Sequence, residues 1–329
     1  MKQNSYQTLV YKINENIGRI NNYDSNYEKR LNYELEIIRN KGFEDYFLIV
    51  EEIVRWAKSR NILMGAGRGS SSGSLVAFIL GITLIDPLKY DLIFERFLNP
   101  ERPDLPDIDL DFQKSRRAEI FDHIIKTYGR ENTCLISTFS RFHAKQLIRD
   151  LSRIFDIDMY TVNKLSKAVP KEIKTFEEAK KFKEVSDFLA KNPEIDQLAE
   201  ELEGAIRQKS VHPAGIIITP GPISDYIAIE RVKGQQCSCF DMEAIDSLGL
   251  LKIDILSLKT LDVIARAVEL SKLNYTNLPL EFTDPKVFKI FSDGLTLGVF
   301  QFESSLLTGL SKKLQIADFQ TLYAATTIA

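Results

Sequence analysis

Apolar and polar residues follow two different periods along the chain, and together they predict an α+β protein. Residues 26–40 and 43–60 carry apolar side chains at intervals of three and four, which predicts two amphipathic helices. Residues 107–112 alternate between acidic and apolar side chains, which predicts a strand with one acidic face. Further strands are predicted at 62–64, 133–138 and in short pieces over 215–256, and further helices at 74–80, 91–98, 115–127, 140–208 and from 260 onward.

The order of these elements predicts the domain organisation. A chain of 329 residues is long enough for two or three domains. Residues 140–208 are rich in Lys and Glu and are predicted to form a helical block inserted into an α+β domain, with a second helical region after it. Residues 1–25 are polar and rich in Asn, and we expect them to be a loosely held lead-in.

The composition is that of a folded globular protein. Hydrophobic residues make up 44% and charged residues 27%, so a sizeable core can be buried. The formal net charge is -3, so any basic surface for nucleic acid must be local. Cys134, Cys237 and Cys239 are expected to be free thiols, because nothing nearby completes a set of zinc ligands. No apolar run of membrane-spanning length and no signal-peptide core occur, which predicts an intracellular, cytoplasmic protein.

Three aspartates share one face of the predicted strand at 107–112. Asp107, Asp109 and Asp111 point one way, and the apolar residues between them point into a core. Three carboxylates in a row repel one another, so the pattern indicates a cation that neutralises them. Mg²⁺ prefers carboxylate oxygens together with substrate phosphates, and two-metal sites serve phosphoryl transfer.

Three alternatives are open for this strand. An EF-hand loop requires Gly where Phe112 stands, and its intervening residues are not apolar. A phosphatase of the haloacid-dehalogenase type would need Thr at the position of Asp111. The third alternative is a solvated acidic edge strand that binds no metal.

A second polar pair lies in the apolar segment 250–256. Lys252 and Asp254 share one face of this predicted strand, where an unpartnered Asp would be costly. If this strand lies beside the first, Asp254 joins the acidic cluster and Lys252 reaches phosphates that the metal also binds. The alternative is a buried Lys–Asp pair with a structural role.

The Gly- and Ser-rich segment 65–74 joins a predicted strand to a predicted helix. Small residues let backbone N–H groups approach a phosphate, and a helix N-terminus favours anions. The segment matches neither the Walker A loop nor the dinucleotide-binding spacing. A flexible connector is the alternative.

A basic ridge is predicted on the helix that follows residue 140. Arg141, Lys145, Arg149 and Arg153 recur every four residues, and such a ridge can follow a sugar-phosphate backbone. The alternative is a solvated helix face whose charges pair with acids such as Asp150.

These motifs together resemble the C family of DNA polymerases, the alpha subunits of bacterial DNA polymerase III. The resemblance runs from about Tyr33 to Ala329. The stretches that carry it are GFEDYFLIV, GRGSSSGSLVAFILGI, DPLKYDLIFERFLNPERPDLPDIDLDF, TFSRFHAKQLIRD, SVHPAGIIITP, LLKIDILSLKTL and GVFQFES, in that order.

The resemblance implies a fold and a division into domains. The fold would be a polymerase-beta-like nucleotidyltransferase palm with a mixed sheet, formed by residues 1–138 and 210–259. Residues 139–209 would be the inserted helical thumb that grips duplex DNA. Residues 260–329 would begin the helical fingers.

The resemblance also implies roles for individual residues. Asp107, Asp109 and Asp254 would be the catalytic, metal-binding carboxylates, with Asp111 as a further candidate, and would hold two Mg²⁺ ions. Gly69, Ser70, Arg96 and Lys252 would hold the phosphates of the incoming dNTP. Arg141, Lys145, Arg149 and Arg153 would bind DNA. Gln301 and Glu303 match the fingers motif without an assigned role.

The implied function is template-directed DNA synthesis on a primer 3′-hydroxyl with release of pyrophosphate, in a bacterial or bacteriophage-infected cell. The expected partners are primer-template DNA, a C-terminal fingers and clamp-binding portion, a sliding clamp and a separate proofreading exonuclease. Motifs of the family's N-terminal phosphoesterase-like domain and of an exonuclease are missing, and Ala329 falls inside the fingers. We therefore expect a partial catalytic core. The alternatives are a different nucleotidyltransferase, a non-catalytic DNA-binding module and a metal-dependent phosphatase.

Overall fold

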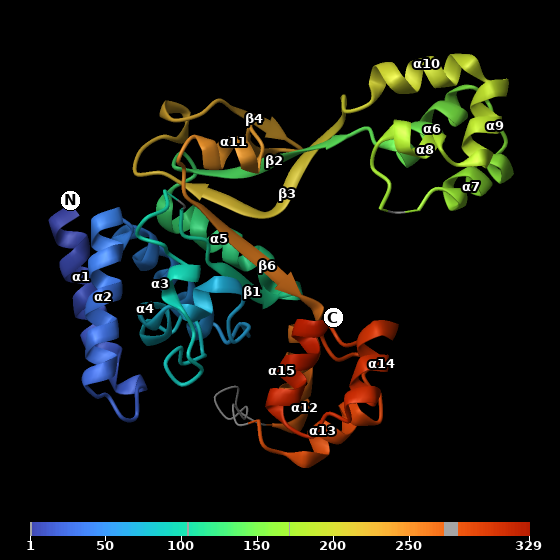
Figure 1. Cartoon of the computed structure of the whole chain (residues 1–329). Coiled ribbons are helices and arrows are strands. Elements are labelled where there is room, and N and C mark those ends of the chain that lie inside the picture. The colour runs from blue at the N-terminus through green and yellow to red at the C-terminus, as the bar shows by residue number, and fades with distance from the viewer. Residues whose placement is uncertain (1, 104, 171, 273–281) are drawn as a thin grey trace. The chain divides into compact units, whose positions relative to one another are not determined.

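The computed structural model describes residues 2–103, 105–170, 172–272 and 282–329 (Figure 1). Its strands form one mixed sheet in the hydrogen-bonded order β1-β6-β3-β2-β5-β4, and helices make up most of the rest, so the predicted α+β class is confirmed. The helical stretches predicted at 140–208 and from 260 onward include residues 171 and 273–281, which lie outside the described residues. The strands are β1 (Asp109–Gln113), β2 (Thr133–Arg141), β3 (Ile206–Ile218), β4 (Ile229–Val232), β5 (Gln235–Ser238) and β6 (Lys252–Leu258).

The chain divides into two compact units. The first comprises Met1–Thr133, Ala214–Pro220 and Leu251–Ala329, and the second comprises Cys134–Pro213 and Gly221–Leu250. The helices of the first unit are α1 (Lys2–Asn16), α2 (Ser25–Lys41), α3 (Glu44–Ser59), α4 (Leu75–Ile79), α5 (Arg117–Tyr128), α12 (Lys259–Ser271), α13 (Pro285–Ser292), α14 (Ser305–Leu314) and α15 (Phe319–Ile328). Those of the second are α6 (Ala144–Ile154), α7 (Met159–Ala168), α8 (Phe176–Lys180), α9 (Lys183–Lys191), α10 (Pro193–Leu202) and α11 (Met242–Ser247).

The two helices predicted from apolar periodicity are confirmed as α2 and α3. On α3 the predicted stripe of Phe47, Val50, Val54 and Ala57 is buried. Helix α2 ends at Gly42, whose φ of 72° is the left-handed conformation that terminates helices. Because the stripe is continuous over about three turns, local sequence sufficed to predict it.

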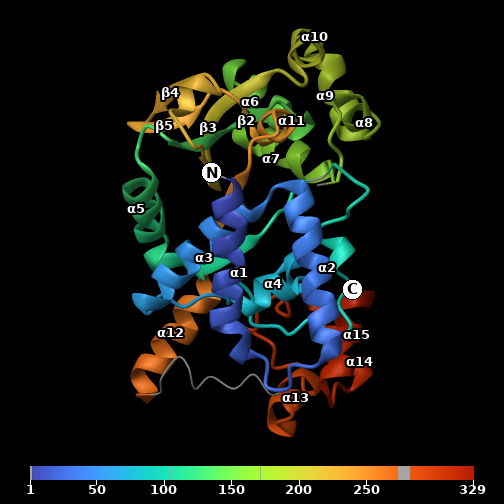
Figure 2. The same ribbon diagram turned by 90° about the vertical axis from the view of Figure 1, so that its left-hand side faces the viewer.

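The first 25 residues are not a loose lead-in, and that expectation is wrong. Helix α1 packs against α3, as Figure 2 shows, and buries Leu9 and Ile13 one turn apart. Lys12 Nζ lies 2.8 Å from Glu51 Oε2 of α3. The polar composition hid this helix, since two buried residues on one face are enough to dock it.

The helix predicted at 91–98 is also wrong. Only the 3₁₀ turn η3 (Phe94–Arg96) forms there. Asp91 has a φ of 51°, which a helix interior does not permit, and Leu92 N donates to Pro87 O at 2.8 Å in a turn. A single turn is enough to bury Phe94, Phe97 and Leu98, so the apolar spacing looked helical over a longer stretch.

Strand β1 pairs in parallel with β6, and β6 pairs antiparallel with β3. The predicted strand at 107–112 begins at Asp109, so Asp107 lies just before it. The predicted strand at 62–64 is reduced to a single antiparallel bridge between Met64 and Phe112. The strands predicted at 133–138 and over 215–256 are confirmed as β2 to β6, with β2 and β3 longer than expected.

In the second unit, helices α6 to α10 enclose a core of their own. The buried face of α6 is made by Ala144, Leu147, Ile148 and Leu151, packed with Phe176 of α8. In the first unit, α13 to α15 enclose a smaller core that includes Phe288, Phe291 and Phe302. The palm, thumb and fingers boundaries stay predictions. Within the described part of the chain, every helix is too short or too polar to cross a membrane.

We expect Leu9→Ala to lower the free energy of unfolding by about 2–5 kcal/mol, because it leaves a cavity between α1 and α3. Gln7→Ala, at an exposed position of the same helix, is the matched control and should change stability little. Chemical denaturation of both variants measures the difference. Equal stabilities would show that α1 is not docked.

Candidate active site

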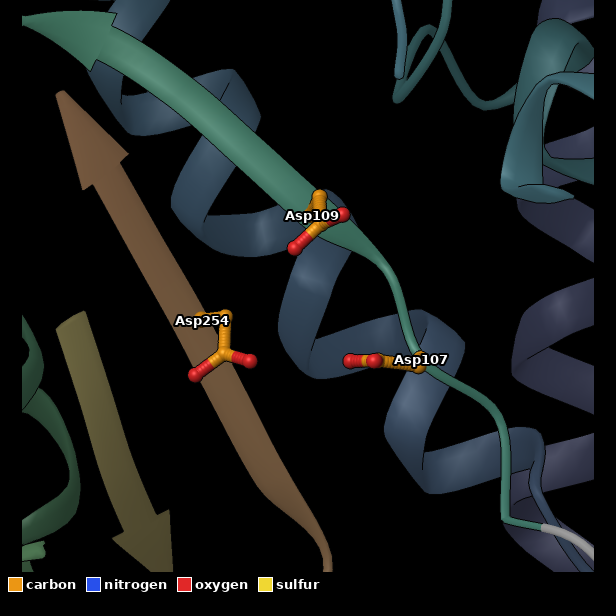
Figure 3. A group of neighbouring side chains, drawn as sticks. All are labelled: Asp107, Asp109 and Asp254. Carbon is orange, nitrogen blue, oxygen red and sulfur yellow. The ribbon is translucent and has the colours of Figure 1, made fainter. Parts of the chain in front are cut away.

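The β1–β6 pairing brings together three carboxylates from distant parts of the chain. Asp109 of β1 is the register partner of Asp254 of β6. One carboxylate oxygen each of Asp107, Asp109 and Asp254 lies within 4.8 Å of the others. Figure 3 shows Asp107 and Asp109 directed from one segment toward Asp254 on the neighbouring strand. The predicted convergence of these acids is confirmed.

The donor chemistry of this triad fits a metal ion. Asp107 is exposed, Asp109 is partly exposed and Asp254 is 7% exposed, so one side of the triad opens to solvent. Oδ1 of Asp254 is buried and, among the described residues, accepts no hydrogen bond. A buried carboxylate oxygen without a donor is costly, and a hard cation with oxygen ligands would satisfy it.

Burial and neighbouring charges shift the pKa of two acids at the site. Burial raises the pKa of Asp109, and the charge of Asp107 raises it further. Burial also raises the pKa of Asp111, which the neighbouring Arg68 opposes. The alternative of a solvated edge strand fits poorly, because Asp111 and Asp254 are both buried.

Lys252 lies inside the acidic cluster. Its Nζ is 2.8 Å from Asp254 Oδ2 and 3.1 Å from Asp107 Oδ1. Burial by itself lowers the pKa of Lys252, but its hydrogen bonds and charge interactions with the two aspartates raise it overall. The ammonium group is therefore held protonated beside the triad. It bridges two segments, which a simple Lys–Asp pair would not do.

The Gly- and Ser-rich segment lies against the acidic row. Gly65 N donates to Asp111 O at 2.9 Å. Gly69 has a φ of 67°, and a Cβ there would lie 3.6 Å from Asp109 Oδ2. Residues 69–73 form the 3₁₀ turn η2 (Gly69–Gly73), whose Ser71 hydroxyl donates to Arg68 O at 3.0 Å. The segment is thus a tight turn and not a flexible connector.

One expectation for this segment needs correction. The N-terminus of the following helix α4 was expected to favour an anion such as phosphate. Its amides at Leu75 and Val76 instead donate to the buried carboxylate of Glu34, at 2.9 and 3.0 Å. An internal anion therefore already occupies this helix end, and the amides of Gly69 and Ser70 lie upstream of it.

Two residues at the site were missed from the sequence. Arg68 Nε lies 4.0 Å from Asp109 Oδ2, and its Nη1 lies 3.7 Å from Asp111 Oδ1. Arg68 is the only charged residue of the ten-residue segment 65–74, and this signal could have been used. Asp111 thus faces Arg68 and is not a member of the triad.

The second missed residue is Tyr46 of α3. Its hydroxyl accepts a hydrogen bond of 2.9 Å from Ile108 N, the amide between Asp107 and Asp109. The ring is buried, so this bond fixes the backbone that carries both acids. No local pattern indicates it, because the two partners lie far apart in the chain.

The remaining predicted residues do not join the triad by any contact among the described residues. Arg96 is exposed on η3. Glu303 Oε1 accepts a hydrogen bond from Gly298 N at 2.9 Å, and Gln301 adopts a φ of 64°. Their proposed roles stay predictions.

The basic ridge differs from its prediction in one respect. Lys145, Arg149 and Arg153 lie on α6, but Arg141 ends β2, where its Nη1 donates to Gly204 O at 2.8 Å. The helix begins at Ala144 because β2 continues through 141. Asp150 Oδ2 lies 2.6 Å from Arg207 Nε, and Asp150 Oδ1 lies 3.9 Å from Arg153 Nη2. The carboxylate of Asp150 therefore neutralises part of the ridge.

The fold and the site define a class: an α+β protein whose sheet carries a carboxylate triad suited to metal binding. Comparison with known proteins gives the family. Residues 4–257 match the bacterial DNA polymerase III alpha NTPase domain, and residues 260–329 match the bacterial DNA polymerase III alpha subunit finger domain. The chain belongs to the bacterial DNA polymerase III alpha family.

Two relatives illustrate the match. The chain is 39% identical to DNA polymerase III subunit alpha of Aquifex aeolicus over 96% of its length. It is also 39% identical to DNA polymerase III subunit alpha of Staphylococcus aureus, over 93% of its length. In both cases the chain spans 30% of the relative.

We expect Asp109→Asn to raise the thermal unfolding midpoint of the metal-free protein near neutral pH. The raised pKa of Asp109 means that its ionised form destabilises the fold, and this cost appears as the pH rises through that pKa. The difference from wild type should vanish below the ordinary Asp pKa of about 3.9. Added Mg²⁺ should stabilise wild type more than the variant.

Asp122→Asn on α5 is the matched control, since it removes an exposed carboxylate outside the triad. It should leave the midpoint and its response to Mg²⁺ nearly unchanged. A lower midpoint for Asp109→Asn without metal would contradict the electrostatic account of the triad.

Proposed function

We propose that this chain is part of the catalytic core of a template-directed DNA polymerase. It adds dNTPs to a primer 3′-hydroxyl and releases pyrophosphate. The observation that carries the proposal is the direct register of Asp109 with Asp254, which places both carboxylates beside Asp107. Family membership supports it, since the relatives are named as DNA polymerase III alpha subunits.

In this proposal Asp107, Asp109 and Asp254 hold two Mg²⁺ ions. When bound, the ions lower the pKa of the primer hydroxyl and stabilise the pyrophosphate leaving group. Asp254 supplies a buried oxygen without a hydrogen-bond donor among the described residues, and Asp107 and Asp109 supply the more exposed ligands. Their different burial leaves an open side on which the primer end and the nucleotide can meet.

Other groups of the site would bind the triphosphate. Lys252 is protonated and adjoins two of the triad acids, so it can reach a phosphate held there. The amides of Gly69 and Ser70 begin a 3₁₀ turn and lack acceptors inside it. Arg68 adds a guanidinium beside Asp109 and Asp111. Arg96 stays a proposed phosphate ligand on the strength of its motif.

The proposed architecture follows the family. Residues 1–138 and 210–259 would form a polymerase-beta-like palm, residues 139–209 the thumb and residues 260–329 the beginning of the fingers. The proposed substrates are primer-template DNA and dNTPs. The further partners would be the C-terminal portion that the longer relatives carry, a sliding clamp and a separate exonuclease, in the cytoplasm of a bacterial or phage-infected cell.

The alternative functions have less support. A decayed, non-catalytic module would be expected to have lost triad acids, but Asp107, Asp109 and Asp254 are all present and converge. A phosphatase would release phosphate from simple esters without a template or primer. A different nucleotidyltransferase would use the same acids without following a template.

We expect Asp109→Ala to reduce primer extension by roughly three orders of magnitude or more, because it removes a metal ligand and leaves the fold intact. Template-directed dNTP incorporation is measured with the chain alone and with the C-terminal portion of a relative. Asp122→Ala, at an exposed site on α5, is the control and should retain activity. Unchanged extension by the Asp109 variant would overturn the assignment.

We expect the double variant Lys145→Ala/Arg149→Ala to weaken primer-template binding at every sequence. Each lost phosphate contact should reduce the slope of log affinity against log salt by about 1. The control removes Lys183 and Lys191, two exposed lysines of α9, and changes the net charge equally. Binding is measured by titration at several salt concentrations. Equal slopes for wild type and the α6 variant would show that the ridge does not contact DNA.

A further inference from the structure

A fully buried carboxylate stands behind the Gly- and Ser-rich turn. Glu34 lies in the middle of α2 and is 0% exposed. Its Oε1 accepts from Arg30 Nε at 2.7 Å and from Leu75 N at 2.9 Å. Its Oε2 accepts from Ser74 Oγ at 2.9 Å and from Val76 N at 3.0 Å. All four of these partners donate, so both carboxylate oxygens act as acceptors.

Arg30 extends the same network to two other segments. Its Nη2 donates to Gly73 O at 2.7 Å and to Leu92 O at 3.0 Å. Arg30 and Glu34 lie one turn apart on α2, whose first residues are capped by the Asp24 side chain. The pair therefore joins a rigid helix to the end of the 3₁₀ turn, to the start of α4 and to the segment before η3.

Stability alone does not account for this pair. A buried ion pair is often no better than packed apolar residues for holding elements together. Burial raises the pKa of Glu34, and the hydrogen bonds from Leu75, Val76 and Arg30 oppose that rise. The pair instead supplies directional bonds, and such bonds fix the orientation of the backbone that they hold.

The backbone held in this way leads directly to the acidic triad. Glu34 and Arg30 contact residues 73–76, and the turn immediately before them begins at Gly69, next to Asp109. The far end of the turn packs closely on the segment before η3, since a Cβ at Gly73 would lie 2.7 Å from Ile93 O. Glu34 also occupies the amides of Leu75 and Val76, which leaves those of the turn as the anion-binding groups.

We propose that Glu34, together with Arg30, is a positioning residue that holds the Gly69–Gly73 turn so that its amides meet the triphosphate of the incoming nucleotide. This inference rests on the proposed function. Glu34 acts through the turn and does not touch the nucleotide. Glu34 also keeps the triphosphate away from the N-terminus of α4, because a helix N-terminus without a bound carboxylate would attract an anion.

The test compares Glu34→Gln with Glu36→Gln in the assembly that supports DNA synthesis. Gln keeps the shape of Glu34 but turns an NH₂ donor toward N–H groups, so at least one backbone bond is lost. Glu36 is exposed on the same helix and undergoes the same change of charge. We expect Glu34→Gln to raise the KM for Mg²⁺·dNTP about tenfold or more, which corresponds to about 1.4 kcal/mol. The control should match wild type.

The ratio of kinetic constants separates positioning from a general loss of folding. For Glu34→Gln we expect kcat to change by less than about threefold and primer-template affinity to stay unchanged, because the triad is intact. A purely structural role would lower the active fraction and the unfolding midpoint but leave the KM of the active molecules as in wild type. That outcome would overturn the inference.

Arg30→Lys is the second variant and guards against misfolding of the first. It keeps the charge beside Glu34 but loses the fork that reaches Gly73 O and Leu92 O. We expect a smaller rise in KM in the same direction, with faster hydrogen exchange at the amides of Leu75 and Val76. If Arg30→Lys has the same KM and the same hydrogen-exchange rates at Leu75 and Val76 as wild type, the proposed role of the Arg30–Glu34 network is contradicted.

Failure of this inference is distinguishable from failure of the proposed function. If wild type extends primers, Asp109→Ala does not, and Glu34→Gln keeps the wild-type KM, only the positioning role is overturned. If Asp109→Ala extends primers as wild type does, the proposed function falls and this inference falls with it.

Discussion

Parallel hydrogen bonding between β1 and β6 is the constraint on which the rest of the structure depends. It sets Asp109 directly opposite Asp254, and like charges at such a cross-strand pair destabilise a sheet. The opposite faces of the strands compensate, because Leu110, Phe112, Ile253 and Ile255 are buried there. Tyr46 adds a hydrogen bond to the Ile108 amide and so fixes the segment that carries the first two acids. The hydrophobic core thus holds a charge arrangement that would otherwise separate.

Two basic side chains offset the negative charge around this pairing only in part. Lys252 bridges Asp107 and Asp254, and Arg68 lies between Asp109 and Asp111. Two basic side chains beside four carboxylates leave an excess of negative charge. Burial raises the pKa of Asp109 most, and the charge of Asp107 raises it further. Such an excess, with a buried oxygen of Asp254 that accepts no hydrogen bond among the described residues, suits a divalent cation. In the proposed function, Lys252 and Arg68 would also meet the phosphates of a nucleotide.

A second, buried layer of polar groups lies behind the first. Glu34 and Arg30 make no contact with the triad, yet their hydrogen bonds end at the turn that borders it. Fully satisfied polar networks of this kind specify one backbone arrangement at a cost that apolar packing would not incur. The glycines of the turn complete the arrangement. Gly69 adopts the left-handed φ of 67° beside Asp109, and Gly73 lies too close to Ile93 O for a side chain.

Local sequence was sufficient wherever a feature depended on neighbours within a few residues. It determined the strand with Asp109 and Asp111 on one face, the apolar stripe of α3, and the shared face of Lys252 and Asp254, because side-chain periods of 2 and 3.6 follow from backbone geometry. Tertiary structure alone decided which strand lies beside β1, that α1 docks through Leu9 and Ile13, that residues 91–98 form one turn, and that Arg141 ends a strand. It also determined the contacts of Tyr46, Arg68 and Glu34, because the residues that they contact lie far away in the chain. The face on which a side chain lies follows from the local backbone geometry, but the residue that it contacts follows from the packing of the whole fold.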